Sequence, residues 1–117
     1  VKPPYETFLT KKVDCGDAAA FGTYILYYNG LDAWMFCVRI PAYKDWHAGT
    51  LLNLTDGYIV IDWLRFLKIG KESISPKFTT LKEAADWLAK YSGDYDQYIL
   101  FRITDPYAEP PQPPRVG

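Results

Sequence analysis

Two cysteines and one histidine are the residues of this chain best suited to nucleophilic chemistry. Cys15 or Cys37 with His47 and an aspartate is the one cysteine–histidine set in the sequence, and such a set can activate a thiol. Cys37 falls in the middle of an apolar run, which is typical of a buried structural thiol. Cys15 stands beside acidic residues, and a nearby carboxylate raises the pKa of a thiol. These local sequences argue against catalysis, and an enzyme would need a pocket that gathers His47 with Cys15 or with Asp45.

The two thiols have two other fates open to them. They could form a disulfide if the chain is exported, or both could be buried and free. One histidine and the lack of a CxxC spacing exclude a multi-histidine or cysteine-rich zinc site. We therefore expect no metal and no cofactor.

Other catalytic patterns are weak. Asp56 with Asp62, or Asp94 with Asp96, could form the carboxylate pair of a glycoside hydrolase. Their neighbours are turn and helix-ending residues, which favours an interpretation as solvated loop acids. The serines lie outside any GxSxG motif, and no phosphate-cradling glycine loop occurs. We expect a protein that is not an enzyme.

Aromatic side chains are unusually frequent, with ten Tyr, six Phe and four Trp in 117 residues. Exposed aromatic rings can stack on sugars, but Tyr and Trp are also enriched in protein interfaces. The chain also ends in a proline-rich peptide of the kind that aromatic grooves bind. The predicted partner-binding residues are Tyr43, Trp46, His47, Trp63, Phe66, Tyr95, Tyr98, Tyr107, Pro110, Pro113 and Arg115. We expect the partner to be another protein or copies of this chain.

A locally basic stretch, residues 63–78, supports a different class of ligand. Its interleaved aromatic residues could stack on single-stranded bases, and its basic residues are Arg65, Lys68, Lys71 and Lys77. Lysines that protect an edge strand from pairing with other chains explain the same pattern. The whole-chain charge of −1 disfavours nucleic acid. A module for carbohydrate or single-stranded nucleic acid is the alternative function.

Turn signals predict the strands that would position these residues. Asn29-Gly30 predicts a hairpin of residues 23–28 and 33–40, and Asp56-Gly57 predicts a second one of residues 51–54 and 58–61. Residues 42–49 between them are expected to form an exposed loop. Residues 62–69 fit the helical and the strand period poorly, and we favour a strand there.

A helix over about residues 81–91 is the clearest single element. Thr80 and Glu83 form a capping box, and Gly93 is placed to end the helix. The apolar stripe of the helix consists of Leu81, Ala84, Ala85, Leu88 and Tyr91. A last strand is predicted over residues 95–103.

Together these elements predict an α+β domain with five to six mainly antiparallel strands, two hairpins and one helix. Residues 1–17 form an N-terminal arm, residues 18–105 the domain and residues 106–117 a proline-rich tail. No apolar run reaches the ~18–20 residues of a membrane span, and the first residues do not resemble a signal peptide. We expect a location in the cytoplasm or in a virion. The predicted function is a non-catalytic interaction protein, either a subunit of a larger assembly such as a viral or phage particle or a small inhibitor.

Overall fold

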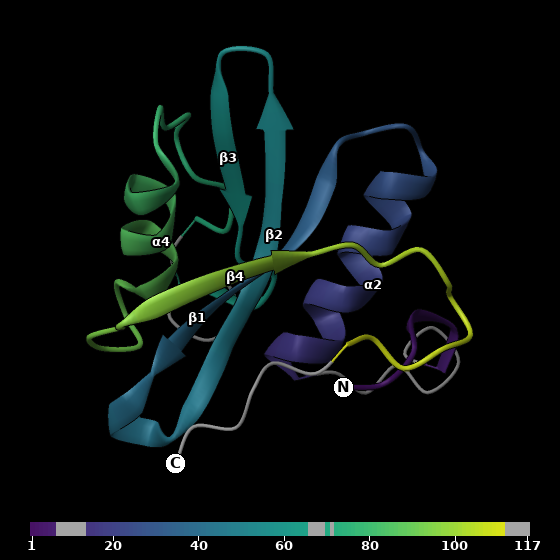
Figure 1. The fold of residues 1–117 in the computed structure, drawn as a ribbon, viewed down its shortest axis with the longest axis horizontal. Helices are drawn as coiled ribbons and strands as arrows, with labels where there is room; N and C mark the ends of the chain where they lie inside the picture. The colour runs from purple at the N-terminus through teal and green to yellow at the C-terminus, as the bar shows by residue number, and fades with distance from the viewer. Residues whose placement is uncertain (7–13, 66–69, 71, 112–117) are drawn as a thin grey trace.

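One antiparallel sheet organises the molecule. The computed structural model describes residues 1–6, 14–65, 70 and 72–111. Its elements are α2 (Cys15–Tyr28), β1 (Ala33–Ile40), a 3₁₀ turn (Pro41–Tyr43), β2 (Asp45–Leu54), β3 (Gly57–Ile61), α4 (Leu81–Ala89) and β4 (Gln97–Phe101). The strand order is β3-β2-β1-β4 (Figure 1). The α+β class is confirmed, and the sheet has four strands where five to six were predicted.

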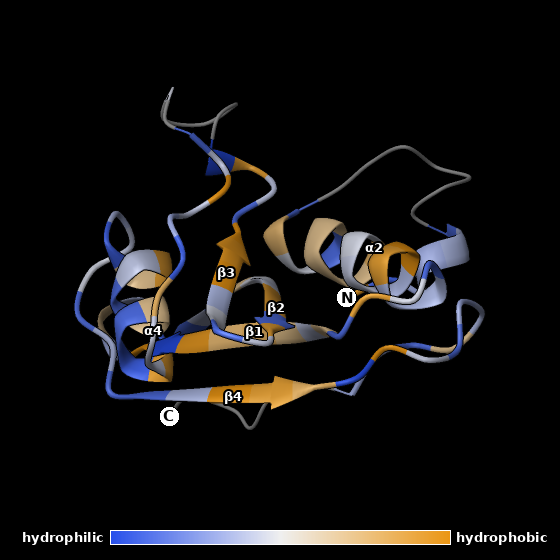
Figure 2. Cartoon of the chain, turned by 90° about the horizontal axis from the view of Figure 1, so that it is seen from above, coloured by the Kyte–Doolittle hydropathy of each residue, from blue (hydrophilic) through white to orange (hydrophobic). Residues whose placement is uncertain are grey.

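The central strand β1 is buried on both faces. Its even-numbered residues, such as Phe36 and Val38, share a core with Leu88 of α4. Its odd-numbered residues, such as Met35, share a second core with Ala19 of α2. Figures 1 and 2 place the two helices at opposite sides of the molecule, with strands between them. A strand covered on both faces explains why the sequence of β1 is an almost continuous apolar run.

The first predicted hairpin is wrong, because residues 15–28 form helix α2. Asp14 caps this helix in a capping box: its side chain accepts from the Asp17 amide, and its own amide donates to the Asp17 side chain. Three consecutive alanines, strong helix formers, follow this cap. Asn29 and Gly30 end the helix, and Gly30 adopts a φ of 89°. Glycine at a positive φ is suited both to the end of a helix and to a hairpin turn. Here Gly30 ends a helix, which is why Asn29-Gly30 alone did not distinguish the two.

The second predicted hairpin is confirmed as β2 and β3, which meet at the pair Leu54–Gly57. Strand β2 begins earlier than predicted, since Asp45 pairs with Ile40 and His47 with Val38 of β1. Most of the expected loop at residues 42–49 is therefore strand. Residues 45–49 form a strand because they pair with the β-branched and apolar residues of β1, a partner that their own local sequence does not reveal.

Strand β3 ends at Ile61, opposite Thr50. Asp62 lies outside the strand, Trp63 and Leu64 form a turn, and Arg65 is helical. The amide of Arg65 donates to the carbonyl of Asp62 at 3.2 Å, which closes this turn. The strand predicted for residues 62–69 is therefore wrong over residues 62–65, and residues 66–69 lie outside the described part.

The predicted helix near the C-terminus is confirmed as α4, Leu81–Ala89. The Thr80 hydroxyl accepts the Glu83 amide at 3.1 Å, a cap that contributes about 1 kcal/mol. Gly93 follows with a φ of 115°. The last predicted strand is confirmed as the shorter β4, whose colour in Figure 2 changes from hydrophilic to hydrophobic along its length.

A tight contact fixes α2 against the sheet. A Cβ atom at Gly22 would lie 2.2 Å from a ring carbon of Trp63, so the indole rests directly on the helix backbone. The Trp63 indole N–H donates to the Thr50 hydroxyl at 2.9 Å, and the Thr50 and Thr23 hydroxyls are hydrogen-bonded at 2.6 Å. The middle of α2 is thereby held at a defined position beside β2.

The two terminal segments contact each other. The Tyr5 amide donates to the Pro106 carbonyl at 2.8 Å, and the Tyr5 and Tyr107 rings lie 5.0 Å apart. The predicted division into arm, domain and tail stays a prediction, although Cys15 and Asp17 of the arm belong to α2. Among the described residues, no helix has the length and apolar character to span a bilayer.

Candidate functional site

The structure brings Cys15, His47 and Asp62 together from three separate elements. Cys15 is the first residue of α2, His47 lies on β2, and Asp62 directly follows β3. His47 Nε2 is 2.7 Å from Asp62 Oδ2, and Cys15 and His47 lie close enough for each side chain to shift the pKa of the other. Because Nε2 faces the carboxylate, Nδ1 is the ring nitrogen left for the thiol. A nucleophile, a base and a group that orients the base are thus aligned in series.

The surroundings of Cys15 favour its thiolate. Burial alone would raise the pKa of the thiol, but hydrogen bonds from His47 and from the Ala48 backbone, with the charge of His47, lower it overall. The position at the positive end of a helix acts in the same direction. The sequence argument that the neighbouring acids dominate is wrong, since Asp14 makes only the weakest of these contributions. The side chains of Asp14 and Asp17 are engaged in the helix cap.

The pKa of His47 is raised to about 9. Burial disfavours the imidazolium, but the hydrogen bond to Asp62 and the contact with Cys15 outweigh burial. Asp62 is 4% exposed, so its carboxylate is shielded from water. The shifts of Cys15 and His47 have opposite directions and together favour a thiolate–imidazolium ion pair.

Two clefts open beside this ion pair and share Cys15, His47, Tyr91 and Ser92. One, of about 210 Å³, continues to Leu64, Arg65 and Leu88, so its wall is largely apolar. The other, of about 310 Å³, continues to Tyr43, Asp45 and Trp46. A chain laid across Cys15 would therefore contact a different surface on each side of the sulfur.

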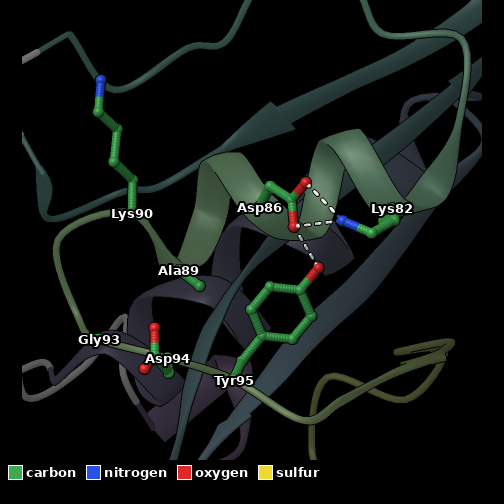
Figure 3. Close-up of a pocket in the computed structure, with 7 residues that line it drawn as sticks. All are labelled: Lys82, Asp86, Ala89, Lys90, Gly93, Asp94 and Tyr95. Atoms are coloured by element: carbon green, nitrogen blue, oxygen red, sulfur yellow. Dashed lines mark hydrogen bonds and ion pairs between the residues drawn. The ribbon is translucent and has the colours of Figure 1, made fainter.

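A larger cleft, of about 600 Å³, lies elsewhere, between α4 and the segment that leads to β4. In Figure 3 the Lys82 ammonium and the Tyr95 hydroxyl converge on the Asp86 carboxylate, while Lys90 points away from them. Lys82 and Tyr95 thus both donate to the Asp86 carboxylate at the protein surface. This cleft contains neither a cysteine nor a histidine.

The predicted partner-binding residues are scattered over the molecule. Tyr43, Tyr98 and Tyr107 are exposed, whereas Trp46, Trp63 and Tyr95 are half-buried and pack against the two cores. His47 belongs to the cleft at Cys15, and Pro110 is buried. Phe66, Pro113 and Arg115 lie outside the described residues.

The predicted basic stretch is not one cationic surface in its described part. Arg65 is buried, and Lys77 forms an ion pair of 2.7 Å with Asp56. Lys68 and Lys71 lie outside the described residues. The two cysteines are free thiols, so the disulfide that the sequence left open is not formed in this structure.

Asp62 is the residue of this candidate site that the sequence did not reveal. It was interpreted as a solvated loop acid, which is wrong because the structure buries it against His47. The register of the β2–β3 hairpin could have revealed this contact. Extending the pair Thr50–Ile61 by one residue sets Asp62 opposite Gly49, and His47 is then the diagonal neighbour on the same face.

Among the described residues, no group of three or more His, Cys, Asp and Glu side chains is arranged to hold a metal ion. No protein-family model, curated protein or solved structure matches this chain.

Proposed function

We propose that this protein is a cysteine-dependent acyl-transfer enzyme that acts on an amide or ester carbonyl. The observation that carries the proposal is the Cys15–His47–Asp62 series, with the nucleophile at a helix N-terminus and the His47–Asp62 contact at 2.7 Å. An enzyme needs a pocket that gathers His47 with Cys15, and both residues line the two clefts at this site, which supports the proposal.

In the first half-reaction the Cys15 thiolate attacks the carbonyl carbon and forms a C–S bond. The His47 imidazolium donates its proton to the leaving amine or alcohol as the C–N or C–O bond breaks. The product is a thioester on Cys15 and a neutral imidazole. Asp62 keeps the ring oriented toward the sulfur in both protonation states.

In the second half-reaction water or an amine attacks the thioester carbon. His47 takes the proton of this acceptor, and the C–S bond breaks to restore the thiolate–imidazolium pair. The first-turn amides of an α-helix lack partners within the helix. The amides of Cys15 and Gly16 are therefore the groups we assign to stabilise the negative oxygen of the tetrahedral intermediate.

A chromogenic ester tests this proposal directly. We expect p-nitrophenyl acetate to release nitrophenol and to leave one acetyl group on the protein, which mass spectrometry of a tryptic digest would locate on Cys15. The buried Cys37 is the matched control, because burial raises the pKa of its thiol to about 12. Cys37→Ala should acylate like the wild type and Cys15→Ala should not. Acylation of Cys15→Ala at the wild-type rate would contradict the proposal.

A non-catalytic interaction protein is the second candidate. It is supported by the exposed aromatic rings, of which Tyr43 and Tyr107 are 70% and 71% exposed. Two results together would favour this candidate. The wild type would not be acylated by the ester, and the wild type and Cys15→Ala would capture the same protein partner equally well. The module for carbohydrate or single-stranded nucleic acid stays a prediction. Binding of these ligands to the wild type and to Cys15→Ala would test it.

A further inference from the structure

Arg65 is a charged side chain that lies buried beside the Cys15 site and has no part in the reaction above. It is 4% exposed, and its Nε is buried without a hydrogen-bond partner. A charged group removed from water is costly unless opposite charge or acceptor groups surround it. The contacts of Arg65 therefore indicate what its burial achieves.

The first contact is with Asp62. Arg65 Nε lies 3.5 Å from Asp62 Oδ2, the same oxygen that contacts His47 Nε2. One carboxylate oxygen thus lies between an imidazole and a guanidinium. With the thiolate, imidazolium, carboxylate and guanidinium all charged, the cluster of four groups is electrically neutral.

The second contact is with the C-terminal end of α4. An NH2 group of Arg65 donates to the Trp87 carbonyl at 2.7 Å, and its guanidinium carbon lies 3.4 Å from the centre of the Trp87 ring. The last turn of α4 contains no basic residue of its own. Arg65 supplies the cation that the negative end of this helix favours, and the ring adds a cation–π contact.

These contacts join the two walls of the smaller cleft. Asp62 lies on one wall, and Tyr91 and Ser92, which directly follow α4, lie on the other. We propose that Arg65 is a positioning residue that neutralises and holds Asp62 against His47 and fixes the end of α4, with Tyr91 and Ser92, beside Cys15. This inference rests on the proposed function of the site.

The electrostatic part of this role has a definite sign. Removing a positive charge makes each neighbouring group harder to deprotonate, so the pKa values of Cys15 and His47 should both rise. Arg65 also faces Tyr91, and Glu72 and Lys90 line the adjoining cleft with it. Asp14 acts on Cys15 from the start of α2. These groups are unchanged when only Arg65 is replaced.

The rate of alkylation of Cys15 by iodoacetamide, measured against pH in the full chain, tests the proposal without a substrate. For Arg65→Met we expect the midpoint of the profile to move to higher pH by about one unit. Arg65→Lys keeps the charge and should keep the wild-type midpoint. Lys77→Met is the matched control, since it removes a cation from an exposed ion pair with Asp56 and should not move the midpoint.

The positional part is tested by ester turnover of Arg65→Lys. Lysine cannot reproduce the planar fork of arginine, so we expect KM to rise severalfold. If Arg65→Met does not fold, as judged by circular dichroism, Arg65→Lys alone decides, and a wild-type KM in that variant overturns the proposal. An unshifted midpoint in folded Arg65→Met also overturns it. An ordinary thiol profile for wild-type Cys15 would instead contradict the proposed function.

Discussion

The cleft at Cys15 and the larger cleft at Asp86 contain similar kinds of polar contact but differ in exposure. At the larger cleft, the side chains of Lys82 and Asp86 are 77% and 49% exposed and form an ion pair of 3.0 Å. At the cleft beside Cys15, the side chains of His47 and Asp62 are 20% and 6% exposed, and His47 Nε2 lies 2.7 Å from Asp62 Oδ2. Water screens the first pair and is largely excluded from the second.

This difference in exposure determines the chemistry that each cleft can support. The contacts at Asp86 lower the pKa of its carboxyl, and burial together with the hydrogen bond to Asp86 raises the pKa of Tyr95 to about 12. Both shifts stabilise the ordinary ionisation states of these groups. The contacts at His47 lower the pKa of the Cys15 thiol and raise that of the imidazole, which favours the thiolate that the proposed reaction needs. Cleft size is therefore a poor guide to the candidate site in this protein.

Replacement of the nucleophile should separate the two clefts most strongly. We expect Cys15→Ala to reduce ester turnover by about a thousandfold or more, to the level of the uncatalysed reaction. Asp86→Asn at the larger cleft should leave turnover unchanged, because no group there reaches Cys15. Stopped-flow release of nitrophenol measures both. A comparable loss in the two variants would remove the distinction between the clefts.

Replacement of His47 should have the next largest effect. His47→Gln removes the imidazolium that stabilises the thiolate, so the pKa of Cys15 rises, because only the Ala48 backbone hydrogen bond and the helix terminus still oppose desolvation. We expect ester turnover to fall by about 10²–10⁴-fold and alkylation at neutral pH to slow. Retention of wild-type alkylation in this variant would show that the helix terminus alone activates the thiol.

The pH dependence should distinguish thiolate formation from proton donation by His47. Alkylation should increase as pH rises through the lowered pKa of Cys15 and then stay constant, because it needs only the thiolate. Ester turnover should show the same increase and then decrease as pH rises through about 9, where His47 loses the proton that it gives to the leaving group. Both profiles are measured on the same preparation. A decrease in alkylation at pH 9 would point to unfolding instead.

The smallest effects concern stability. Gly22→Ala places a methyl group against the Trp63 ring and should lower the free energy of unfolding by about 1–3 kcal/mol. Tyr95→Phe at the exposed cleft removes one hydroxyl contact and should change it by about 0.5 kcal/mol or less. Urea titrations followed by circular dichroism compare the two. Equal effects would mean that the contact between α2 and Trp63 stabilises the fold no more than the exposed contact at Tyr95.

Local sequence determined the elements whose signals are short in range. The capping pair Thr80–Glu83 and the turn at Asp56-Gly57 predicted α4 and the β2–β3 hairpin, because each signal acts within a few residues. The run from Thr23 to Tyr28 has strand propensity, yet it is helical because Gly22 and Thr23 pack against Trp63 and Thr50. Tertiary contacts outweigh propensities of a few tenths of a kcal/mol per residue.

The residue types alone identified Cys15 and His47 as the chemical set, and they also led to the expectation of no enzyme. The acids nearest to Cys15 in sequence face the helix cap, while the decisive partners, His47 and Asp62, are distant in sequence. Coulombic and hydrogen-bond effects on a pKa depend on distance in space and on burial. The sequence therefore determined which groups could react, and only the tertiary structure decided that they meet in a shielded cleft.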